Sequence, residues 1–219
     1  MKQGRFVSFE GIEGCGKTTQ IARLSERLRA EGTPCLITRE PGGTAVGEGI
    51  RRILLDSETI HLTPEAELLL FYASRSQNIE ERIRPALERG ETVICDRFFD
   101  ASLAYQGYGR GLSLELIHRL TDLVCRDNRP GVTILLDIDP EVGLARARAR
   151  NEGLARNEGL ARDEGRFEAE DVAFYTRVRE GYLELAAASP ERFQIVPADG
   201  SIAEVESRIW SVFEAAARV

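Results

Sequence analysis

A glycine-rich stretch near the start of the chain constrains its fold more than any other feature. Residues 11–18 read Gly-Ile-Glu-Gly-Cys-Gly-Lys-Thr and match the pattern G-x-x-x-x-G-K-[ST]. An apolar, strand-like run over 5–9 precedes the stretch, and an amphipathic run with Ile21, Leu24 and Leu28 follows it. This order of strand, loop and helix is the context in which the pattern cradles phosphates. The alternative is a glycine-rich turn that fits the pattern by accident, and these flanking elements disfavour it.

The residue types of this loop suit the phosphates of a nucleoside triphosphate. Glycines allow successive backbone N–H groups to turn toward an anion. We expect Lys17 to reach the β- and γ-phosphates and the Thr18 hydroxyl to bind Mg²⁺. The predicted nucleotide-binding residues are Gly11, Ile12, Glu13, Gly14, Cys15, Gly16, Lys17 and Thr18.

Short apolar runs alternate with longer helical stretches along the chain. The expected strands are 5–9, 35–38, 92–96, 132–138 and 193–197. The expected helices are 17–31, 44–55, 64–88, 100–107, 113–127, 140–149, 168–188 and 201–217. We expect Pro85 to kink or divide one of them. Apolar strands separated by helices predict a single α/β domain over 1–219, a P-loop-type doubly wound parallel sheet of five strands with helices on both faces.

The composition argues against several classes of protein. The net charge of −7 opposes a broad electrostatic contact with nucleic acid. No apolar run approaches the ~18 residues that span a membrane, and no signal-peptide pattern opens the chain. The four cysteines are scattered without a C-x-x-C pair. We therefore expect reduced thiols in a cytoplasmic protein, with neither a disulfide framework nor a zinc site.

One segment breaks the alternation of strands and helices. Residues 151–156, Asn-Glu-Gly-Leu-Ala-Arg, recur at 157–162, and a third copy begins at 163. The repeat is too short for a solenoid unit, so we interpret it as an insertion in an exposed, mobile loop. Interleaved glutamates fit a solvated charge run, but beside a phosphate loop we favour an arginine-rich lid over about 146–168. The arginines gathered there are Arg146, Arg148, Arg150, Arg156, Arg162 and Arg166.

Charged pairs follow two of the expected strands. Arg39-Glu40 ends the second strand, before a Pro-Gly-Gly turn, and Asp96-Arg97 ends the third. The carboxyl edge of a parallel sheet is where such folds bind ligands. Asp96 suits Mg²⁺, either directly or through water, and Arg97 suits bidentate contact with a phosphate. The sequence thus predicts a second anion-binding region close to the phosphate loop.

Two further segments suit a nucleoside as well as they suit an ordinary core. Phe71 and Arg75 are four residues apart and share one face of an expected helix. Ser102, Tyr105 and Gln106 lie in a small-residue segment that fits an ordinary capped helix equally well. Taken alone, Phe71 is more often a core residue and Arg75 a surface charge. The residues themselves leave both interpretations open.

In their order along the chain, these segments resemble the bacterial thymidylate kinase family over essentially the whole length. The motifs are F-E-G-I-E-G-C-G-K-T-T-Q at 9–20, T-R-E-P-G-G-T at 38–44, L-L-L-F-Y-A-S-R at 68–75, I-R-P-A-L-E-R-G at 83–90, I-C-D-R-F at 94–98 and S-L-A-Y-Q-G at 102–107. The resemblance implies phosphoryl transfer from ATP to dTMP, which gives ADP and dTDP. It also implies Mg²⁺ bound chiefly through ATP, and a homodimer.

The resemblance further assigns roles to single residues. Glu13 would meet the sugar 3′-hydroxyl of dTMP, Phe71 would stack on thymine, and Arg75 would bond the carbonyl edge of the base. Phe98 stands where the family has Tyr after Asp-Arg, which removes one hydroxyl. The implied substrate-binding residues, of which Arg39 and Arg97 would hold the dTMP phosphate, are Glu13, Arg39, Phe71, Arg75, Arg97, Ser102, Tyr105 and Gln106.

The acceptor of such a transfer is already an anion, so the task is to offset repulsion rather than to supply a strong base. Family members without a basic residue inside the phosphate loop use arginines of the lid, and this loop has Cys15 and Gly16 where such a residue would stand. The duplicated segment departs from the shorter lid of the family and leaves open which arginine reaches the transferred group. The expected catalytic residues are Lys17, Arg97, Arg148, Arg150 and Arg166.

Other functions fit parts of the pattern. A kinase for another nucleoside monophosphate would share most of it, and a deoxynucleoside kinase would need Glu40 or Asp96 as a carboxylate base. A nucleotide-dependent switch protein would carry D-x-x-G and N/T-K-x-D sequences, which we do not find. The helices at 64–88 and 113–127 are amphipathic and offer a face for a dimer.

Overall fold

The structure is a computed structural model and describes residues 4–56, 62–158, 166–167 and 169–216, without the side chains of 151–158 and 216. Its described part contains one parallel sheet in the order β2-β3-β1-β4-β5. The strands are β1 (Phe6–Glu10), β2 (Cys35–Arg39), β3 (Thr92–Asp96), β4 (Val132–Asp137) and β5 (Phe193–Pro197). The expected doubly wound α/β fold is confirmed, and each expected strand is present with ends that shift by one residue at most.

Burial explains why the central strands are apolar at most of their positions. Every residue of β1 is buried, and β1 pairs with β3 on one side and with β4 on the other. Phe9 lies opposite Asp96 of β3, so the two strands end at the same edge. This register brings the phosphate loop that follows β1 next to the Asp96-Arg97 pair that follows β3.

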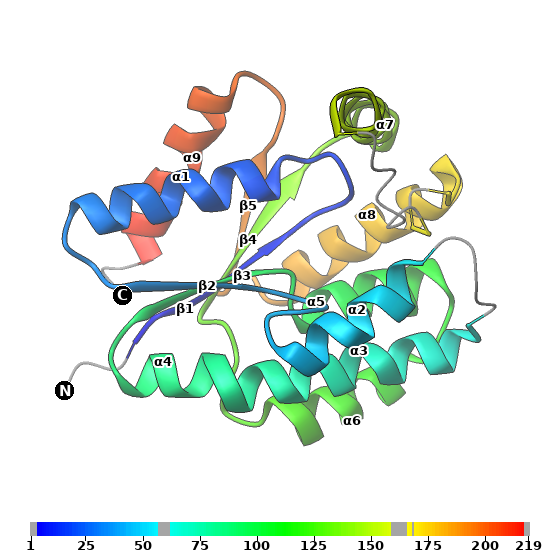
Figure 1. The fold of residues 1–219 in the computed structure, drawn as a ribbon, viewed down its shortest axis with the longest axis horizontal. Coiled ribbons are helices and arrows are strands. Elements are labelled where there is room, and N and C mark those ends of the chain that lie inside the picture. The colour runs from blue at the N-terminus through cyan, green and yellow to red at the C-terminus, as the bar shows by residue number, and fades with distance from the viewer. Residues whose placement is uncertain (1–3, 57–61, 159–165, 168, 217–219) are drawn as a thin grey trace.

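Helices cover both faces of the sheet (Figure 1). The helices α1 (Lys17–Ala30) and α9 (Ile202–Ala216) lie side by side on one face. The other face carries α3 (Pro64–Asn78), α4 (Arg84–Glu88) and α6 (Leu114–Cys125), whose apolar side chains pack on β3. No helix in the described ranges is both long and apolar enough to cross a bilayer.

The long helix expected over 64–88 is divided into three pieces. A π-helical turn, Ile79–Ile83, separates α3 from α4. Pro85 lacks an N–H and its ring crowds the carbonyl four residues back, at Glu81, so the ladder of hydrogen bonds widens just before the proline. The segment expected as helix 100–107 likewise begins as α5 (Phe99–Ser102) and continues as a π-helix, Leu103–Gly109. The π-helix Leu103–Gly109 packs against α8 (Val172–Ala188).

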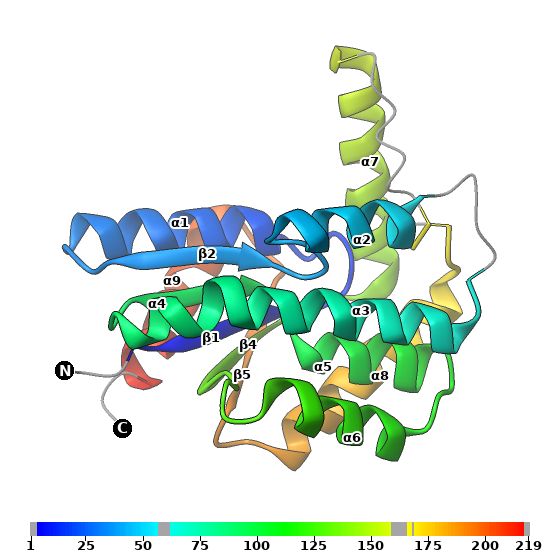
Figure 2. The ribbon, with the colours of Figure 1, turned by 60° about the horizontal axis from the view of Figure 1, so that its bottom comes forward.

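The helix α7 (Pro140–Glu158) follows β4 and projects away from the rest of the chain (Figure 2). It is longer than the expected 140–149, so the first copy of the repeat, 151–156, is helical rather than a loop. Leucine, alanine, arginine and glutamate are good helix formers, whereas Asn151 and Gly153 weaken the run. The remainder of the second copy, 159–162, and the start of the third lie outside the described residues, apart from Arg166.

Candidate active site

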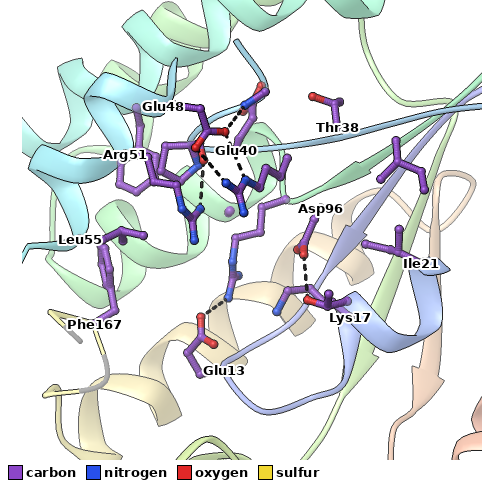
Figure 3. A pocket seen from close by; sticks show the side chains of 18 of the residues that line it. Glu13, Lys17, Ile21, Thr38, Glu40, Glu48, Arg51, Leu55, Asp96 and Phe167 are labelled. Atoms are coloured by element: carbon purple, nitrogen blue, oxygen red, sulfur yellow. Dashed lines mark hydrogen bonds and ion pairs between the residues drawn. The ribbon is translucent and has the colours of Figure 1, made fainter. Parts of the chain in front are cut away.

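A large cleft opens at the carboxyl ends of β1, β2 and β3 (Figure 3). Its volume is about 1160 Å³, above the usual range for a site that holds one small ligand. Figure 3 shows Glu13, Lys17 and Asp96 on one side of it, and Glu40, Glu48 and Arg51 on the other. Of the expected site residues, the cleft is lined by Glu13, Gly14, Gly16, Lys17, Thr18, Arg39, Phe71, Asp96, Arg97, Ser102, Tyr105, Gln106 and Arg150.

The phosphate loop has the backbone shape that its glycines predict. Gly14 has a φ of 73° and lies so close to α7 that a Cβ there would come within 1.9 Å of the Gly143 carbonyl oxygen. Gly16, with a φ of 94°, precedes the first turn of α1, and that turn carries no acidic residue. The unpaired N–H groups of a helix start carry partial positive charge, and here no side-chain carboxylate of that turn competes for it. The loop is therefore suited to an anion.

Lys17 is buried at the floor of the cleft. Its Nζ donates to the carbonyl oxygens of Gly11 and Ile12, both at 3.2 Å, and lies 3.5 Å from the Cys15 sulfur. Gly11, Ile12 and Cys15 themselves do not line the cleft, and Ile12 and Cys15 are packed in the core. The ammonium group is held by its own loop, beside the start of α1.

Hard oxygen donors meet at the edge between β1 and β3. The Thr18 hydroxyl lies 3.5 Å from a carboxylate oxygen of Asp96, and both line the cleft. Within the described residues there is no group of three or more His, Cys, Asp or Glu side chains able to hold a metal ion. Mg²⁺ takes one or two protein oxygens and completes its shell with water and substrate phosphates. Thr18 and Asp96 fit that pattern.

Arg97 lines the cleft and makes four hydrogen bonds to described residues through its guanidinium group. Nη1 donates to the Gly11 carbonyl at 2.8 Å and to the Tyr182 hydroxyl at 3.3 Å. Nη2 donates to Glu13 at 3.0 Å and to the Tyr105 hydroxyl at 2.9 Å. These contacts join β3, the phosphate loop, the π-helix Leu103–Gly109 and α8 through one side chain.

Glu13 projects from the phosphate loop toward Arg97. Burial alone would raise the pKa of Glu13, but the charges of Arg97 and Lys17 outweigh burial and lower it to about 2. The carboxylate is therefore ionised at neutral pH. It accepts from Arg97 and is available to accept from a ligand hydroxyl as well.

Arg39, at the end of β2, is half exposed. Its Nη2 donates to Glu48 at 2.8 Å, and the same carboxylate also accepts from the backbone N–H of Gly43 at 3.0 Å. Glu48 belongs to α2 (Ala45–Leu55). The guanidinium group is thus at the cleft surface, in an ion pair that solvent can reach.

Glu40 and Arg75 form a buried ion pair. Nε of Arg75 donates to Glu40 Oε2 at 2.6 Å, and both side chains are only 1% exposed. Nη2 of Arg75 donates to the Ser102 hydroxyl and to the Phe98 carbonyl, both at 3.1 Å, whereas the buried Nη1 has no acceptor in the described part of the chain. Arg75 is therefore no surface charge. It does not line the cleft itself but bonds to Ser102, which does.

The far end of the cleft is aromatic. Phe71 lines it with Tyr105, and Phe167 packs on both rings at centroid distances of 6.2 and 5.8 Å. Gln106 donates to Glu67 at 2.8 Å. Phe71 is only partly buried, so part of its ring faces the cleft. Such a pocket suits a flat base that offers polar atoms at its edge.

The helix α7 presents alternate arginines to different sides. Arg146 and Arg150 are four residues apart, share one face of α7, and both line the cleft. Arg148 lies about 200° around the helix from Arg150 at ~100° per residue and does not line the cleft. Of the two expected catalytic residues on α7, only Arg150 therefore reaches the cleft.

Arg166 also lies outside the cleft lining. Its guanidinium donates to the buried Glu67 at 2.5 Å and to the Leu54 carbonyl at 3.1 Å. The side chain expected to reach the transferred phosphoryl group is instead held between α2 and α3. Sequence could not reveal this partner, because Glu67 is 99 residues away.

Two buried residues at the site carry no sequence signal of their own. Glu10, at the end of β1, accepts from the Phe98 N–H at 2.7 Å and from the Tyr182 hydroxyl at 2.7 Å. Tyr182 belongs to α8, and no motif in the sequence distinguishes it from an ordinary helical residue. The position of Glu10 between a strand and a phosphate loop is the one hint of a role.

The cleft combines a phosphate loop, an arginine beside that loop and an aromatic pocket. This combination defines the class of the protein, a P-loop phosphotransferase. The sequence model of the family described as "Thymidylate kinase" matches residues 9–209, nearly the whole chain. The chain belongs to the thymidylate kinase family, which confirms the resemblance seen in its motifs.

Individual relatives agree over almost their full lengths. The chain is 52% identical over 205 residues to the thymidylate kinase of Syntrophotalea carbinolica, covering 94% of this chain and 93% of that protein. It is 49% identical over 211 residues to the thymidylate kinase of Deinococcus radiodurans, covering 96% and 97%. The crystal structure of thymidylate kinase from Ehrlichia chaffeensis matches with a TM-score of 0.76 and 32% identity, covering 96% of this chain and 99% of that one.

Proposed function

We propose that the cleft binds ATP at the phosphate loop and dTMP in the aromatic pocket, with the transferred phosphoryl group between them at Arg97. The overall activity follows from the family: the chain catalyses ATP-dependent phosphorylation of dTMP to dTDP. The observation that carries the proposed arrangement is that Lys17, Arg97 and Phe71 line one continuous cleft.

On the donor side, backbone N–H groups of 11–18 hold the ATP phosphates, and Lys17 exchanges its loop carbonyls for phosphate oxygens. On the acceptor side, Arg97 and Arg39 hold the dTMP phosphate, with Arg39 leaving Glu48. Arg150 approaches from α7 and offsets charge on the transferred group. Because an anionic oxygen attacks, alignment and charge neutralisation carry the catalysis.

We assign the metal to the edge between β1 and β3. The Thr18 hydroxyl and Asp96, directly or through water, would hold a Mg²⁺ ion there. The ion would supply charge neutralisation on the ATP phosphates when bound. The absence of a larger acidic cluster in the described residues fits an ion that arrives with the nucleotide.

The base pocket suits a pyrimidine with carbonyl groups. Phe71 offers a ring for stacking, and Gln106 and Ser102 offer polar atoms beside it. The buried Nη1 of Arg75 has no acceptor among the described residues, and an unsatisfied buried donor is costly. A thymine carbonyl would satisfy it, provided that the base reaches past Ser102.

A deoxynucleoside kinase would need a free carboxylate base near the acceptor. In the interior, the Glu40 carboxylate accepts hydrogen bonds from Arg75 Nε at 2.6 Å and from Asn78 Nδ2 at 3.3 Å. Asp96 lies beside Thr18, where the metal is expected. Neither carboxylate favours that alternative.

The test measures ADP release with Mg²⁺ and ATP across dTMP, dUMP, dGMP, AMP and thymidine. We expect dTMP to have the highest kcat/KM and dTDP to form in equal amount to ADP. A preference for another acceptor, or ADP release without dTDP, would contradict the proposed pocket.

We also propose a homodimer formed through α3 and α6. The two helices lie side by side, and large apolar side chains on them are exposed: Leu69 is 57%, Leu116 43% and Leu123 67% exposed. Light scattering on the purified protein should give twice the 24.4 kDa chain mass. A Leu123→Glu variant should give the monomer mass.

A cytoplasmic location is likewise a proposal. It is supported by the cysteines, because Cys15, Cys35, Cys95 and Cys125 are all free thiols. Unpaired cysteines are typical of proteins in reducing compartments. Fractionation of the source cell, with antibody detection of the chain, tests this.

A further inference from the structure

The backbone at Arg97 is held in an unusual shape. Its φ is 66°, in the left-handed region that a residue with a Cβ rarely adopts. The amides on either side of this corner are both bonded to the end of β1: Arg97 N–H donates to the Phe9 carbonyl at 2.9 Å, and Phe98 N–H donates to Glu10 Oε1 at 2.7 Å. The Glu10 side chain thus supports the corner that aims Arg97 at the cleft.

The second oxygen of Glu10 reaches the same arginine by another route. The Tyr182 hydroxyl bonds Glu10 Oε2 at 2.7 Å, and Arg97 Nη1 donates to that hydroxyl at 3.3 Å. Glu10 is fully buried, Tyr182 is 1% exposed, and neither lines the cleft. One carboxylate therefore contacts the backbone beside Arg97 and, through Tyr182, its guanidinium group.

The direction of each hydrogen bond follows from the donors available. A guanidinium group only donates, so the Tyr182 oxygen accepts from Arg97. The hydroxyl hydrogen then has Glu10 as its acceptor. Burial raises the pKa of Tyr182 well above its ordinary value, so the hydroxyl keeps this hydrogen. The chain of bonds runs from Arg97 through Tyr182 to Glu10.

We propose that Glu10 and Tyr182 are a pair of positioning residues that orient the Arg97 guanidinium for phosphoryl transfer. They touch neither nucleotide, and they act by fixing both the backbone and the charged end of Arg97. The inference rests on the role proposed above for Arg97. Because a guanidinium group displaced by a fraction of an ångström loses alignment in the transition state, the pair should affect kcat more than nucleotide affinity.

The test compares Tyr182→Phe with Tyr108→Phe. Each change removes only a hydroxyl that bonds a carboxylate: Tyr182 bonds Glu10, and Tyr108 bonds Glu184 of α8 at 2.9 Å, at the surface. We expect Tyr182→Phe to lower kcat for dTMP by about tenfold or more, with the KM for ATP within about twofold of wild type. Tyr108→Phe should keep wild-type kinetics.

Glu10→Gln examines the pair from its other end. An amide in this place either turns an NH₂ group toward the Phe98 N–H or donates to Tyr182, whose hydroxyl hydrogen then loses its acceptor. We expect a loss of kcat like that of Tyr182→Phe. Since the two act as a unit, the double variant should be no slower than the slower single variant by more than about twofold.

The outcomes separate the inference from the proposed function. A Tyr182→Phe enzyme as fast as Tyr108→Phe overturns the inference, and so do single-variant losses that multiply in the double variant. If Tyr182→Phe lowers kcat and raises the KM for ATP by equal factors, with a large drop in Tm, its role is merely structural. That result also overturns the inference. A wild-type protein that makes no dTDP overturns both proposals, which no difference among variants can mimic.

Discussion

Arg75 Nε lies 2.6 Å from Glu40 Oε2 in the interior, and this ion pair joins α3 to the turn that follows β2. Burial raises the pKa of Glu40, and the charge of Arg75 and its hydrogen bond act in the opposite direction. The pair is only 1% exposed on either side, so water cannot replace a missing partner. Removal of either charge would therefore leave the other buried without its counter-ion, which lowers the stability of the fold.

Glu40→Gln should lower the free energy of unfolding by about 3 kcal/mol or more, because it leaves the Arg75 charge buried without its counter-ion. The amide also cannot accept at both ends, although Arg75 and Asn78 both donate there. Urea denaturation followed by circular dichroism measures the change. The matched control is Glu115→Gln, whose pair with Arg119 is more than 70% exposed on both sides and should change stability by less than about 0.5 kcal/mol.

Lys17→Ala should leave the fold intact and lower kcat on the order of 10³-fold, as the removal of a group that binds developing charge does elsewhere. Within the described residues the Nζ bonds two carbonyl oxygens and a sulfur of its own loop, and alanine favours a helix as well as lysine does. Steady-state ADP release and Tm are measured together. Arg23→Ala, which removes an exposed cation of the same helix, should keep wild-type kcat; equal rates for the two variants would exclude Lys17 from catalysis.

The sequence predicts much of this geometry because its strongest signals are local. Each strand is apolar over most of its positions, and the charged residues that end β1, β2 and β3 must meet at one edge of a parallel sheet. The sequence alone therefore predicts that the phosphate loop and the Asp96-Arg97 pair lie together. Phe71 and Gln106 were placed in the site by resemblance to the family, and both line the cleft.

What the sequence does not reveal are partners distant along the chain. Glu10 and Tyr182 are 172 residues apart, and Arg166 finds Glu67 rather than a phosphate. In a segment crowded with arginines and glutamates, composition gives no means to pair one with another. The sequence also does not reveal which side of α7 faces the cleft, because the helix extends past the expected end at 149. Helical spacing across 148–150 turns Arg148 away from the cleft that Arg150 lines.

Stability should depend on pH through Glu10. Burial, and next the charge of Asp100, raises the pKa of Glu10 from 4.5 to about 8. Between these values the folded protein keeps a proton that the unfolded chain has lost, so stability from this group is greatest below about pH 4.5 and falls as the pH rises toward 8. The slope for one group is at most ~1.4 kcal/mol per pH unit.

Glu10→Gln removes this titration and leaves the other groups in place. The difference in unfolding free energy, variant minus wild type, should therefore rise between pH 5 and 8 and level off above that range. Urea denaturation at each pH measures it. A difference that stays constant with pH would show that Glu10 is ionised in the fold throughout.

Arg148 and Arg150 of α7 provide the sharpest test of the cleft. Arg148 and Arg150 are both exposed on one helix, but only Arg150 lines the cleft, and its charge contributes to the lowered pKa of Glu13 in the phosphate loop. Arg150→Ala should lower kcat on the order of 10³-fold, because an arginine at a transferred phosphoryl group contributes that much or more. Arg148→Ala makes the same change in charge and helix propensity and should stay within about twofold of wild type. Single-turnover transfer to dTMP, which excludes product release, measures both; equal losses would mean that the helix as a whole, rather than its cleft-facing side, carries the charge that the reaction needs.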